Sequence, residues 1–392
     1  MTEGPVTAVI LAAGEGRRLK PLTNRRPKPM IPVANRPLLE YIVEAVAEAG
    51  LDQITLVVGY RHERIRNHFG DGDDWGVTIE YVEQSTQLGT GHAVLQAEPT
   101  VDGPFVVLNG DRIVDSELVE RVADAARSET HPTMAVTTSE EPRGYGVVTF
   151  DGDHVTGIDE KPEGPVETNR INAGVYGFSL GIFDAIRSTE TNGELALTAT
   201  LDALADGADG VHTLTYTGRW LDVSNLWDLL SVNAGLIDTN VTTLHESRPD
   251  DTGGHVADDV VLADSARVGP AVTIGGNTAI GQNVTLEANA VVENAIIFPD
   301  AVIGAGAVVR DAVVANNAQI GPNVTVEGSP APMVVEDTVH HDIELGGVIG
   351  DNAIIGAGST LTTGAVVGDD VDTDAGVTID SRVAAGATVR RG

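Results

Sequence analysis

A glycine-containing turn followed by a dense run of cations lies near the start of the chain, at residues 11–30, LAAGEGRRLKPLTNRRPKPM. Glycines that follow an apolar strand let backbone amides approach phosphate groups, and Gly14 and Gly16 are placed for that use. A dinucleotide-binding turn would continue as GxGxxG, whereas here Arg17 and Arg18 follow the glycines. The additional positive charge favours a triphosphate as the ligand.

Lysine is nearly absent from the rest of the chain. The sequence has 24 basic residues against 58 acidic ones, and only three of the basic residues are lysines, Lys20, Lys28 and Lys161. Because surface lysine has been almost eliminated, we expect the surviving Lys28 and Lys161 to take part in chemistry. Arg25 and Arg26 carry no such distinction, and we expect them to be solvated loop charges.

The acidic composition argues against several classes of function. A formal net charge of −34 repels a phosphate backbone, so no nucleic-acid partner is expected. The chain has no cysteine, which excludes disulfides and thiolate metal sites, and its histidines show no zinc-ligand spacing. Abundant Asp with little Lys is typical of high-salt cytoplasm, so we expect a haloarchaeal source.

The N-terminal residues predict neither export nor a membrane partner. The segment MTEGPVTAVILAAG has no basic leader, and its apolar run of about eight residues is shorter than a membrane span. We therefore expect a cytoplasmic enzyme.

The turn and its cations must be positioned by the elements around them. Short β-rich runs alternate with helical patterns over the first 235 or so residues, for example TAVILAAG, PLLEYIVEAVAEAG and QITLVVGY. This alternation predicts an α/β fold, a Rossmann-like sheet with crossover helices. Such sheets bind ligands beyond the carboxyl ends of their strands, where AAGEG and LNGD lie.

A second periodicity begins after a polar, Gly- and Pro-containing stretch. An aliphatic residue returns at every sixth position, as at Ile274, Ile280, Leu286 and Val292, and the pattern continues with slips to Val367. Hexapeptide periodicity is typical of a left-handed parallel β-helix. The predicted organisation is an α/β domain at 1–238, a linker at 239–257 and a β-helix at 258–392.

The opening stretch resembles the GxGxRL…PK signature of sugar-1-phosphate nucleotidylyltransferases. Six further segments match motifs of that family in the same order: EQSTQLGTGHA, LNGD, YGVV, DEKP, INAGVY and WLDV. The β-helix matches too, because the bifunctional uridylyltransferase/acetyltransferase family and its archaeal relatives carry one in the same place. Glucose-1-phosphate thymidylyltransferases are the other branch that the motifs resemble.

The family reaction is attack of a sugar-1-phosphate oxygen on the α-phosphorus of a nucleoside triphosphate, with release of pyrophosphate. The resemblance implies that Ala13, Gly14 and Gly16 hold the nucleotide, that Arg18 binds the leaving phosphates and that Lys28 reaches the α-phosphate and the sugar phosphate. Such transfers need positioning and cations more than a covalent nucleophile.

The other nucleotide and metal contacts are also implied by the resemblance. Asp111 and Asp222 match the family's Mg²⁺ ligands, and paired carboxylates suit that ion. Gln84 and the backbone of Gly89 resemble the edge that reads a pyrimidine, so the nucleotide is UTP or dTTP.

Four residues resemble the sugar-phosphate contacts, namely Gly146, Glu160, Lys161 and Asn172. Asn192 departs from the family, because many relatives have an arginine there that helps to hold the sugar phosphate. The sugar, glucose 1-phosphate or N-acetylglucosamine 1-phosphate, is therefore left open.

The β-helix allows two alignments with the bifunctional relatives. One places His340 in register with their acetyltransferase base, and the other fits residues 345–368 to their terminal coils, with the catalytic segment deleted. The second matches more residues, so a β-helix with an oligomerisation role, building a trimer-based homo-oligomer, or with a regulatory role is preferred over an active acetyltransferase. The remaining alternatives are a bifunctional enzyme that also acetylates glucosamine 1-phosphate and an inactive nucleotide-sugar sensor; intact Arg18, Lys28, Asp111 and Asp222 argue against the sensor.

The charge predicts that the fold depends on salt. Repulsion between acidic groups is screened beyond about 3 Å at ~1 M salt but reaches about 30 Å at ~0.01 M. We expect the melting temperature, followed by circular dichroism, to fall steadily as KCl is lowered over that range. A melting temperature independent of KCl would contradict this prediction.

Overall fold

The computed structural model describes residues 5–59, 61–128, 131–190, 193–205, 207, 210–240, 254–335 and 338–391. The chain divides into two compact units. Unit 1 comprises Met1–Glu15, Pro27–Met30 and Leu38–Asp222, and unit 2 comprises Gly16–Arg26, Ile31–Pro37 and Val223–Gly392. None of the described helices is long and apolar enough to cross a membrane.

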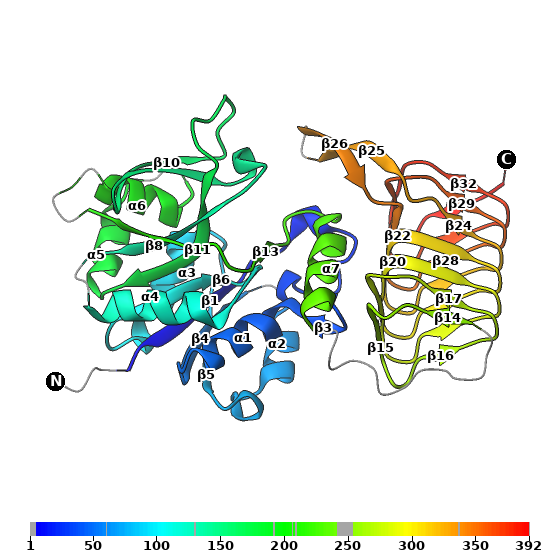
Figure 1. Ribbon diagram of the computed structural model, residues 1–392, viewed down its shortest axis with the longest axis horizontal. Coiled ribbons are helices and arrows are strands. Elements are labelled where there is room, and N and C mark those ends of the chain that lie inside the picture. The colour runs from blue at the N-terminus through cyan, green and yellow to red at the C-terminus, as the bar shows by residue number, and fades with distance from the viewer. Residues whose placement is uncertain are drawn as a thin grey trace. The chain divides into compact units, whose positions relative to one another are not determined.

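Unit 1 is built on a mixed sheet with the strand order β5-β4-β1-β6-β11-β8-β12-β10-β9 (Figure 1). These strands are β1 (Thr7–Ala12), β4 (Gln53–Val58), β5 (Thr78–Glu83), β6 (Phe105–Asn109), β8 (Thr133–Thr138), β9 (Gly146–Asp151), β10 (His154–Glu160), β11 (Arg170–Phe178) and β12 (His212–Thr215). The predicted parallel arrangement is confirmed for β5, β4, β1 and β6. The other half of the sheet contains antiparallel pairs, which the sequence did not predict.

Helices cover both faces of this sheet. They are α1 (Leu38–Glu48), α2 (His62–Phe69), α3 (Thr90–Gln96), α4 (Ser116–Ser128), α5 (Gly181–Ser188) and α6 (Leu197–Ala205). Short pieces complete the unit: η2 (Lys28–Met30), η3 (Asp73–Trp75), η4 (Glu98–Thr100), η5 (Pro142–Gly144), and the ribbon of β7 (Arg112–Val114) and β13 (Trp220–Asp222). Alternate residues of β1 enter opposite cores: Ile10 packs with residues of α1 and α4, and Val9 with residues of α3, α5 and α6. Because β1 is buried on both faces, its sequence is a continuous apolar run.

Unit 2 contains the predicted β-helix. Its strands are β14 (His255–Val256), β15 (Val260–Leu262), β16 (Arg267–Val268), β17 (Thr273–Ile274), β18 (Thr278–Ile280), β19 (Thr285–Leu286), β20 (Val291–Ile297), β21 (Val302–Ile303), β22 (Val308–Val314), β23 (Gln319–Ile320), β24 (Thr325–Val326), β27 (Gly347–Ile349), β28 (Ile354–Ile355), β29 (Thr360–Leu361), β30 (Ala365–Val367), β31 (Asp372–Thr373), β32 (Thr378–Ile379), β33 (Arg382–Val383) and β34 (Thr388–Val389). Paired strands of the coil are parallel, and most lie 17 or 18 residues apart, as in Val292↔Val309 and Thr360↔Thr378. This arrangement is consistent with the left-handed coil that the hexapeptide period predicted.

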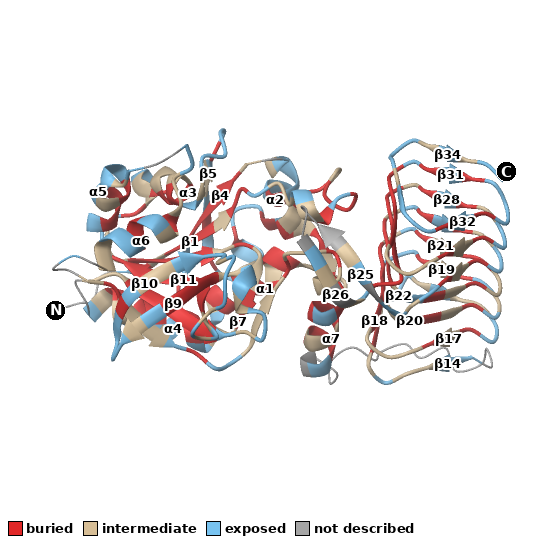
Figure 2. Ribbon diagram, turned by 90° about the horizontal axis from the view of Figure 1, so that it is seen from above, coloured by how far each residue is buried: buried red, intermediate tan, exposed pale blue. Residues whose placement is uncertain are grey.

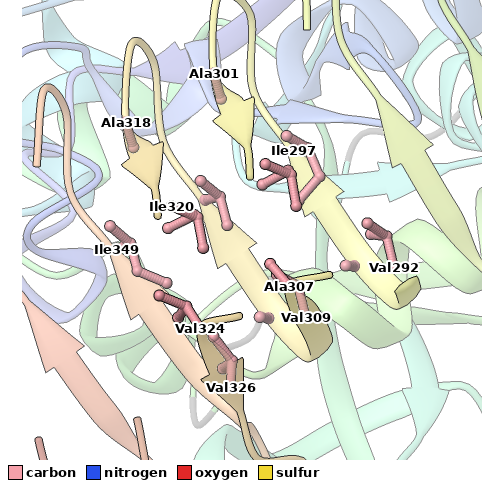
Figure 3. Close-up of a cluster of buried hydrophobic side chains, with 14 of the residues drawn as sticks. Val292, Ile297, Ala301, Ala307, Val309, Ala318, Ile320, Val324, Val326 and Ile349 are labelled. Carbon is pink, nitrogen blue, oxygen red and sulfur yellow. The ribbon is translucent and has the colours of Figure 1, made fainter. Parts of the chain in front are cut away.

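The aliphatic residues of the repeat fill the interior of the coil. Val292, Val309 and Val326 stack in successive turns (Figure 3). Ile303 and Ile320 are paired in the same way. Figure 2 shows the outcome as bands of buried residues that run along the strands of the coil. The predicted core positions Ile274, Ile280 and Leu286 are buried as well, so the hexapeptide interpretation is confirmed.

Asparagine takes the left-handed backbone conformation at many corners of the coil. The φ angles of Asn277, Asn283, Asn289, Asn317, Asn323 and Asn352 are 56°, 58°, 59°, 56°, 54° and 58°. Asn tolerates this conformation better than other residues that carry a side chain, apart from Asp and His. Some of these amides also bind the next coil: Asn283 Nδ2 donates to Asp300 Oδ1 at 3.0 Å, and Asn352 Nδ2 to Asp370 Oδ1 at 2.9 Å.

The compact units divide the chain differently from the predicted domains. Residues 16–26, 31–37 and 223–238 were assigned to the first domain, but they cluster with the β-helix. Hydrogen bonds within unit 2 give one reason. Asn233, in α7 (Asp228–Asn240), accepts from the amide of Ala34 at 2.8 Å and donates to the carbonyl of Asn277 at 2.7 Å, while Asn35 donates to the carbonyl of Ile280 at 2.7 Å. Ala34 and Asn35 lie in the turn between β2 (Pro32–Val33) and β3 (Arg36–Pro37).

The segment that could have carried an acetyltransferase base is an insertion in the coil. Strand β22 pairs with β27 as Ala312↔Gly347, an offset of 35 residues where 17 or 18 is usual. The excess forms an antiparallel hairpin of β25 (Pro330–Val335) and β26 (Thr338–Glu344). The coil then continues through the residues that the second alignment assigned to terminal coils. In the hairpin, the ring of His340 lies 4.9 Å from that of Trp227.

The corner asparagines give a test of this architecture. Replacing the exposed Asn289 by Val should lower the free energy of unfolding by about 1–2 kcal/mol, because a side chain branched at Cβ crowds the carbonyl in the left-handed conformation. Asn289→Gly should leave it unchanged or slightly higher. Denaturant unfolding of both variants measures the difference, and equal stabilities would contradict the assignment.

Candidate functional site

The carboxyl ends of four parallel strands bring several of the predicted motifs together in unit 1. Ala13 follows β1 and Gly110 follows β6, and the amide of Gly110 donates to the carbonyl of Leu11 at 3.0 Å. A Cβ on Gly110 would lie 2.6 Å from that carbonyl, so the close approach requires glycine. The expected position of AAG and LNGD at one sheet edge is confirmed.

The two chemically distinctive residues of the opening stretch and of LNGD form a pair. Nζ of Lys28, at the start of η2, donates to Oδ2 of Asp111 at 2.6 Å. The Lys28 side chain is 12% exposed and that of Asp111 is 34% exposed. Burial alone would raise the pKa of Asp111, but the charges of Lys28 and Arg112 and the hydrogen bonds to its carboxylate lower it. The site therefore keeps a mostly covered ammonium next to an ionised carboxylate that water can reach.

Arg112 organises the second predicted carboxylate. Asp222 faces Arg112 across the β7–β13 ribbon, and its Oδ1 lies 3.5 Å from Arg112 Nε. Oδ2 of Asp222 accepts from the hydroxyl of Tyr145 at 3.3 Å. Burial opposes the charge of Arg112, but Asp222 and Asp111 outweigh it and raise the pKa of Arg112. Asp111 and Asp222 are thus close to the same guanidinium.

The four residues predicted to contact the sugar phosphate lie on neighbouring strands. Gly146 pairs with Glu160 in the β9–β10 register, and a Cβ on Gly146 would meet Glu160 Oε2 at 2.9 Å and the Cβ of Asn172 at 3.7 Å. Lys161 follows at φ 48°, and its amide donates to the carbonyl of Tyr145 at 3.1 Å. The structure therefore brings these four residues together. Asn192 lies outside the described residues.

Asn172 is held from both sides of its amide. Its Nδ2 donates to the hydroxyl of Tyr176 at 2.7 Å, and its Oδ1 accepts from the amide of Gly174 at 2.9 Å. Its backbone carbonyl accepts from Arg112 Nη1 at 2.9 Å. Arg112 therefore links the sugar-side residues to the Asp222 carboxylate.

Gln84 and Gly89 also lie together. Nε2 of the buried Gln84 donates to the carbonyl of Gly89 at 3.1 Å and lies 3.0 Å from Nδ1 of His92. Gly89 caps α3 with φ 102°, and a Cβ there would meet the carbonyl of Leu195 at 2.5 Å. Only glycine fits this backbone, which explains its place in the motif.

The remaining two predicted residues belong to unit 2. Gly16 has φ 63° and caps η1 (Arg17–Leu19), which contains Arg18. The carbonyl of Gly16 accepts from the amide of Leu19 at 3.0 Å and from Oγ1 of Thr23 at 2.8 Å. Their roles stay predictions.

Sequence reasoning missed two arginines. Arg112 directly follows LNGD, and its position next to Asp111 was the signal available in the sequence. Arg26 was expected to be solvated, and this is wrong: its side chain is 7% exposed and its Nη2 pairs with Asp351 Oδ1 at 2.7 Å. The local sequence gave no sign of the distant partner.

The carboxylates suit a hard divalent cation. Asp111 and Asp222 offer oxygen ligands beside one guanidinium, and the exposed part of Asp111 leaves room for water or phosphate. Mg²⁺ is typically held by one or two carboxylates plus water and substrate phosphates. No cluster of three or more acidic, histidine or cysteine ligands occurs in the part of the chain that the structure describes.

Comparison with family models decides the classification. The Nucleotidyl transferase model matches residues 7–239, more than half of the chain, and the GMPPB C-terminal domain model matches residues 256–386. The chain belongs to the nucleotidyl transferase family. Members of this family generally use a divalent metal ion. The resemblance on which the motifs were assigned is thereby confirmed at the level of the family.

Individual members of the family are similar over the first part of the chain. A Bifunctional protein GlmU of Methanocaldococcus jannaschii is 39% identical over 234 residues, which cover 59% of this chain and 54% of that protein. The Low-salt glycan biosynthesis nucleotidyltransferase Agl11 of Haloferax volcanii is 36% identical over 57% of this chain and 64% of its own. A Glucose-1-phosphate thymidylyltransferase of Streptomyces antibioticus is 34% identical over 68% of this chain and 77% of its own length. The chain thus spans little more than half of the length of the first relative.

A solved structure supports the fold. A Bacillus anthracis protein, named as a candidate glucose-1-phosphate thymidylyltransferase, superposes with a TM-score of 0.56 at 22% identity, over 62% of this chain and 98% of that one. The predicted α/β nucleotidyltransferase fold is confirmed.

The Lys28–Asp111 pair predicts a pH-dependent contribution to stability. Because folding lowers the pKa of Asp111, its contribution is complete above the unfolded value of about 3.9 and is lost as the pH falls through the lower folded value. We expect Asp111→Asn to lower the free energy of unfolding at pH 7 and the difference to shrink below about pH 4. Urea unfolding at several pH values measures it, with the exposed Asp102→Asn as control; a pH-independent difference would contradict the pairing.

Proposed function

We propose that this chain is a sugar-1-phosphate nucleotidylyltransferase, which forms an NDP-sugar and pyrophosphate from UTP or dTTP and a sugar 1-phosphate. The observation that carries the proposal is the partly buried Lys28 paired with Asp111 at the carboxyl end of β6, beside β1 and its glycine turn. The names of the GlmU and thymidylyltransferase relatives agree with it.

The mechanism is a displacement at phosphorus. An oxygen of the sugar 1-phosphate attacks the α-phosphorus, the new P–O bond forms, and the bond to the bridging oxygen breaks as pyrophosphate leaves with its electron pair. The main barrier is repulsion between anions. The Lys28 ammonium would offset that charge at the α-phosphate, the amides of Ala13 and Gly14 would hold the nucleotide, and Arg18 would bind the leaving phosphates.

Asp111 and Asp222 would hold Mg²⁺. When bound, the ion would neutralise phosphate charge and orient the leaving group. The protein prepares this site with its own residues. Arg112 and the Tyr145 hydroxyl fix the Asp222 carboxylate, and the lowered pKa of Asp111 keeps it ionised at neutral pH.

The sugar would contact the β9–β10–β11 region. Gly146 has no side chain to occupy the space beside Glu160 and Asn172, whose polar groups can bind sugar hydroxyls. Lys161, next to Glu160, would contact the sugar phosphate. The substrates we propose are glucose 1-phosphate and N-acetylglucosamine 1-phosphate, and Gln84 would read the pyrimidine.

We assign the β-helix no acetyltransferase activity. His340 lies in an inserted hairpin against Trp227, and residues 311–381 contain no Lys or Arg to bind the phosphates of coenzyme A. Assembly into a trimer-based homo-oligomer through the β-helix is proposed as its role instead, with sedimentation analysis as the test.

The test of the activity is pyrophosphate release from a matrix of nucleotides and sugar 1-phosphates, in high KCl with Mg²⁺. We expect turnover with UTP or dTTP and a hexose 1-phosphate. Absence of turnover with every pair would overturn the proposal.

Two substitutions test the site within that assay. Lys28→Met and Asp111→Asn should each lower kcat by about 10²–10³, because each removes charge that acts on the transition state. Arg127→Met and Asp102→Asn, which change the same charges on the surface, should retain activity. Near wild-type rates for Lys28→Met would refute the assignment even if the protein turns over substrate.

A further inference from the structure

We propose that one corner of the β-helix holds the loop Gly16–Arg26, here called the basic loop, and that Arg26 and Asp351 are positioning residues for nucleotide transfer. The basic loop and the β-helix belong to the same compact unit. The inference rests on the proposed function, because it assigns the β-helix a part in the nucleotide chemistry of the basic loop.

Arg26 makes the central contact. Its guanidinium donates to Asp351 Oδ1 at 2.7 Å, with exposures of 7% and 8% for the two side chains, and its carbon lies 4.9 Å from the centre of the buried Phe298 ring. A buried charge that loses its partner is strongly unfavourable. Arg26 therefore has one favourable position, defined by the β-helix.

The two preceding residues contact the same corner. Asn24 Nδ2 donates to Asp369 Oδ2 at 2.9 Å, and Arg25 forms an exposed pair with Asp370. Three consecutive loop residues thus meet carboxylates from two successive coils. Three such contacts together define the position of the loop, whereas a single ion pair between a surface arginine and an acidic protein would not.

Contacts within the β-helix orient the carboxylates of Asp351 and Asp369 independently of the basic loop. Oδ1 of Asp351 also accepts from the amide of Asn316 at 3.0 Å, and the amide of Asp351 donates to Asp369 Oδ1 at 2.9 Å. Backbone amides of the stacked coils therefore orient both side chains. The corner therefore presents carboxylates of defined orientation to residues 24–26.

Internal bonds connect this anchor to the other end of the basic loop. Asn24 donates its amide to the carbonyl of Pro21, Leu22 donates to Leu19, and Thr23 Oγ1 returns to the carbonyl of Gly16. Leu19 and Leu22 are buried. A shift of residues 24–26 would therefore move Gly16 and Arg18, the residues proposed to handle the nucleotide.

Steady-state kinetics on the full chain tests the positioning. Arg26→Ala and Asp351→Asn should each lower kcat/KM for the nucleotide by about 10- to 100-fold, since small misplacements of binding groups have effects of that size. The KM for the sugar phosphate should change less than about twofold, and the double variant should be no worse than the worse single one. The exposed pair Arg310–Glu293 supplies the control, as Arg310→Ala and Glu293→Gln should behave like wild type.

Hydrogen exchange followed by mass spectrometry gives a readout that needs no activity. Asp351→Asn should speed exchange in residues 16–26 at least about tenfold and leave exchange in α1 unchanged. Asn24→Ala should have the same effect more weakly, and it replaces Arg26→Ala in the test if that variant fails to fold. Unchanged exchange would overturn the anchoring. Faster exchange with unchanged kcat/KM would overturn the positioning role. If the wild type turns over no substrate pair, the proposed function fails, and the exchange result alone decides whether the corner anchors the loop.

Discussion

Balanced charge at the end of strand β6 is the constraint on which the site depends. Asp111 and Asp222 would repel each other without Lys28 and Arg112, and neither cation could remain so far buried without the carboxylates. This mutual dependence fixes the start of η2 next to LNGD and holds the β7–β13 ribbon against it. Arg112 extends the constraint to the carbonyl of Asn172 on β11. Anionic substrates entering such a site would meet cations whose partners are already in place.

The architecture was predictable wherever one physical period dominated the sequence. The β-helix core repeats every six residues because each wall of the coil buries one aliphatic side chain, and Ile274, Ile280 and Leu286 lie where that rule places them. The central strands were equally clear, since β1 is buried on both faces. The antiparallel half of the sheet was not predictable, because strand direction depends on connections and partners that local composition does not record. The hairpin at 330–344 interrupts the period, and its form could not be read from that period.

The residues of the candidate site also divide into those that the sequence predicts and those that it does not. Motif residues such as Lys28, Asp111 and Asn172 were singled out because their types and order are characteristic of the family. In unit 1 the structure places Lys28 beside Asp111, and Asn172 near Gly146. Arg26 was misjudged because its partner Asp351 lies 325 residues away and nothing near Arg26 in the sequence marks it as buried. A carboxylate placed by coil stacking can be recognised only once the coils are aligned in space.

The asparagine corners of the β-helix have a consequence for the acidity of the chain. Equivalent corners of successive coils lie about 4.8 Å apart, the spacing of hydrogen-bonded strands. Aspartates at both would form a column of like charge, whereas Asn283 above Asp300 and Asn352 above Asp370 make each negative charge the acceptor of an amide. Where carboxylates of successive coils do meet, at Asp351 and Asp369, donors from Arg26 and Asn24 offset the negative charge. A more acidic surface at these corners therefore requires a donor for each added carboxylate, whether an asparagine in the neighbouring coil or a side chain from another segment.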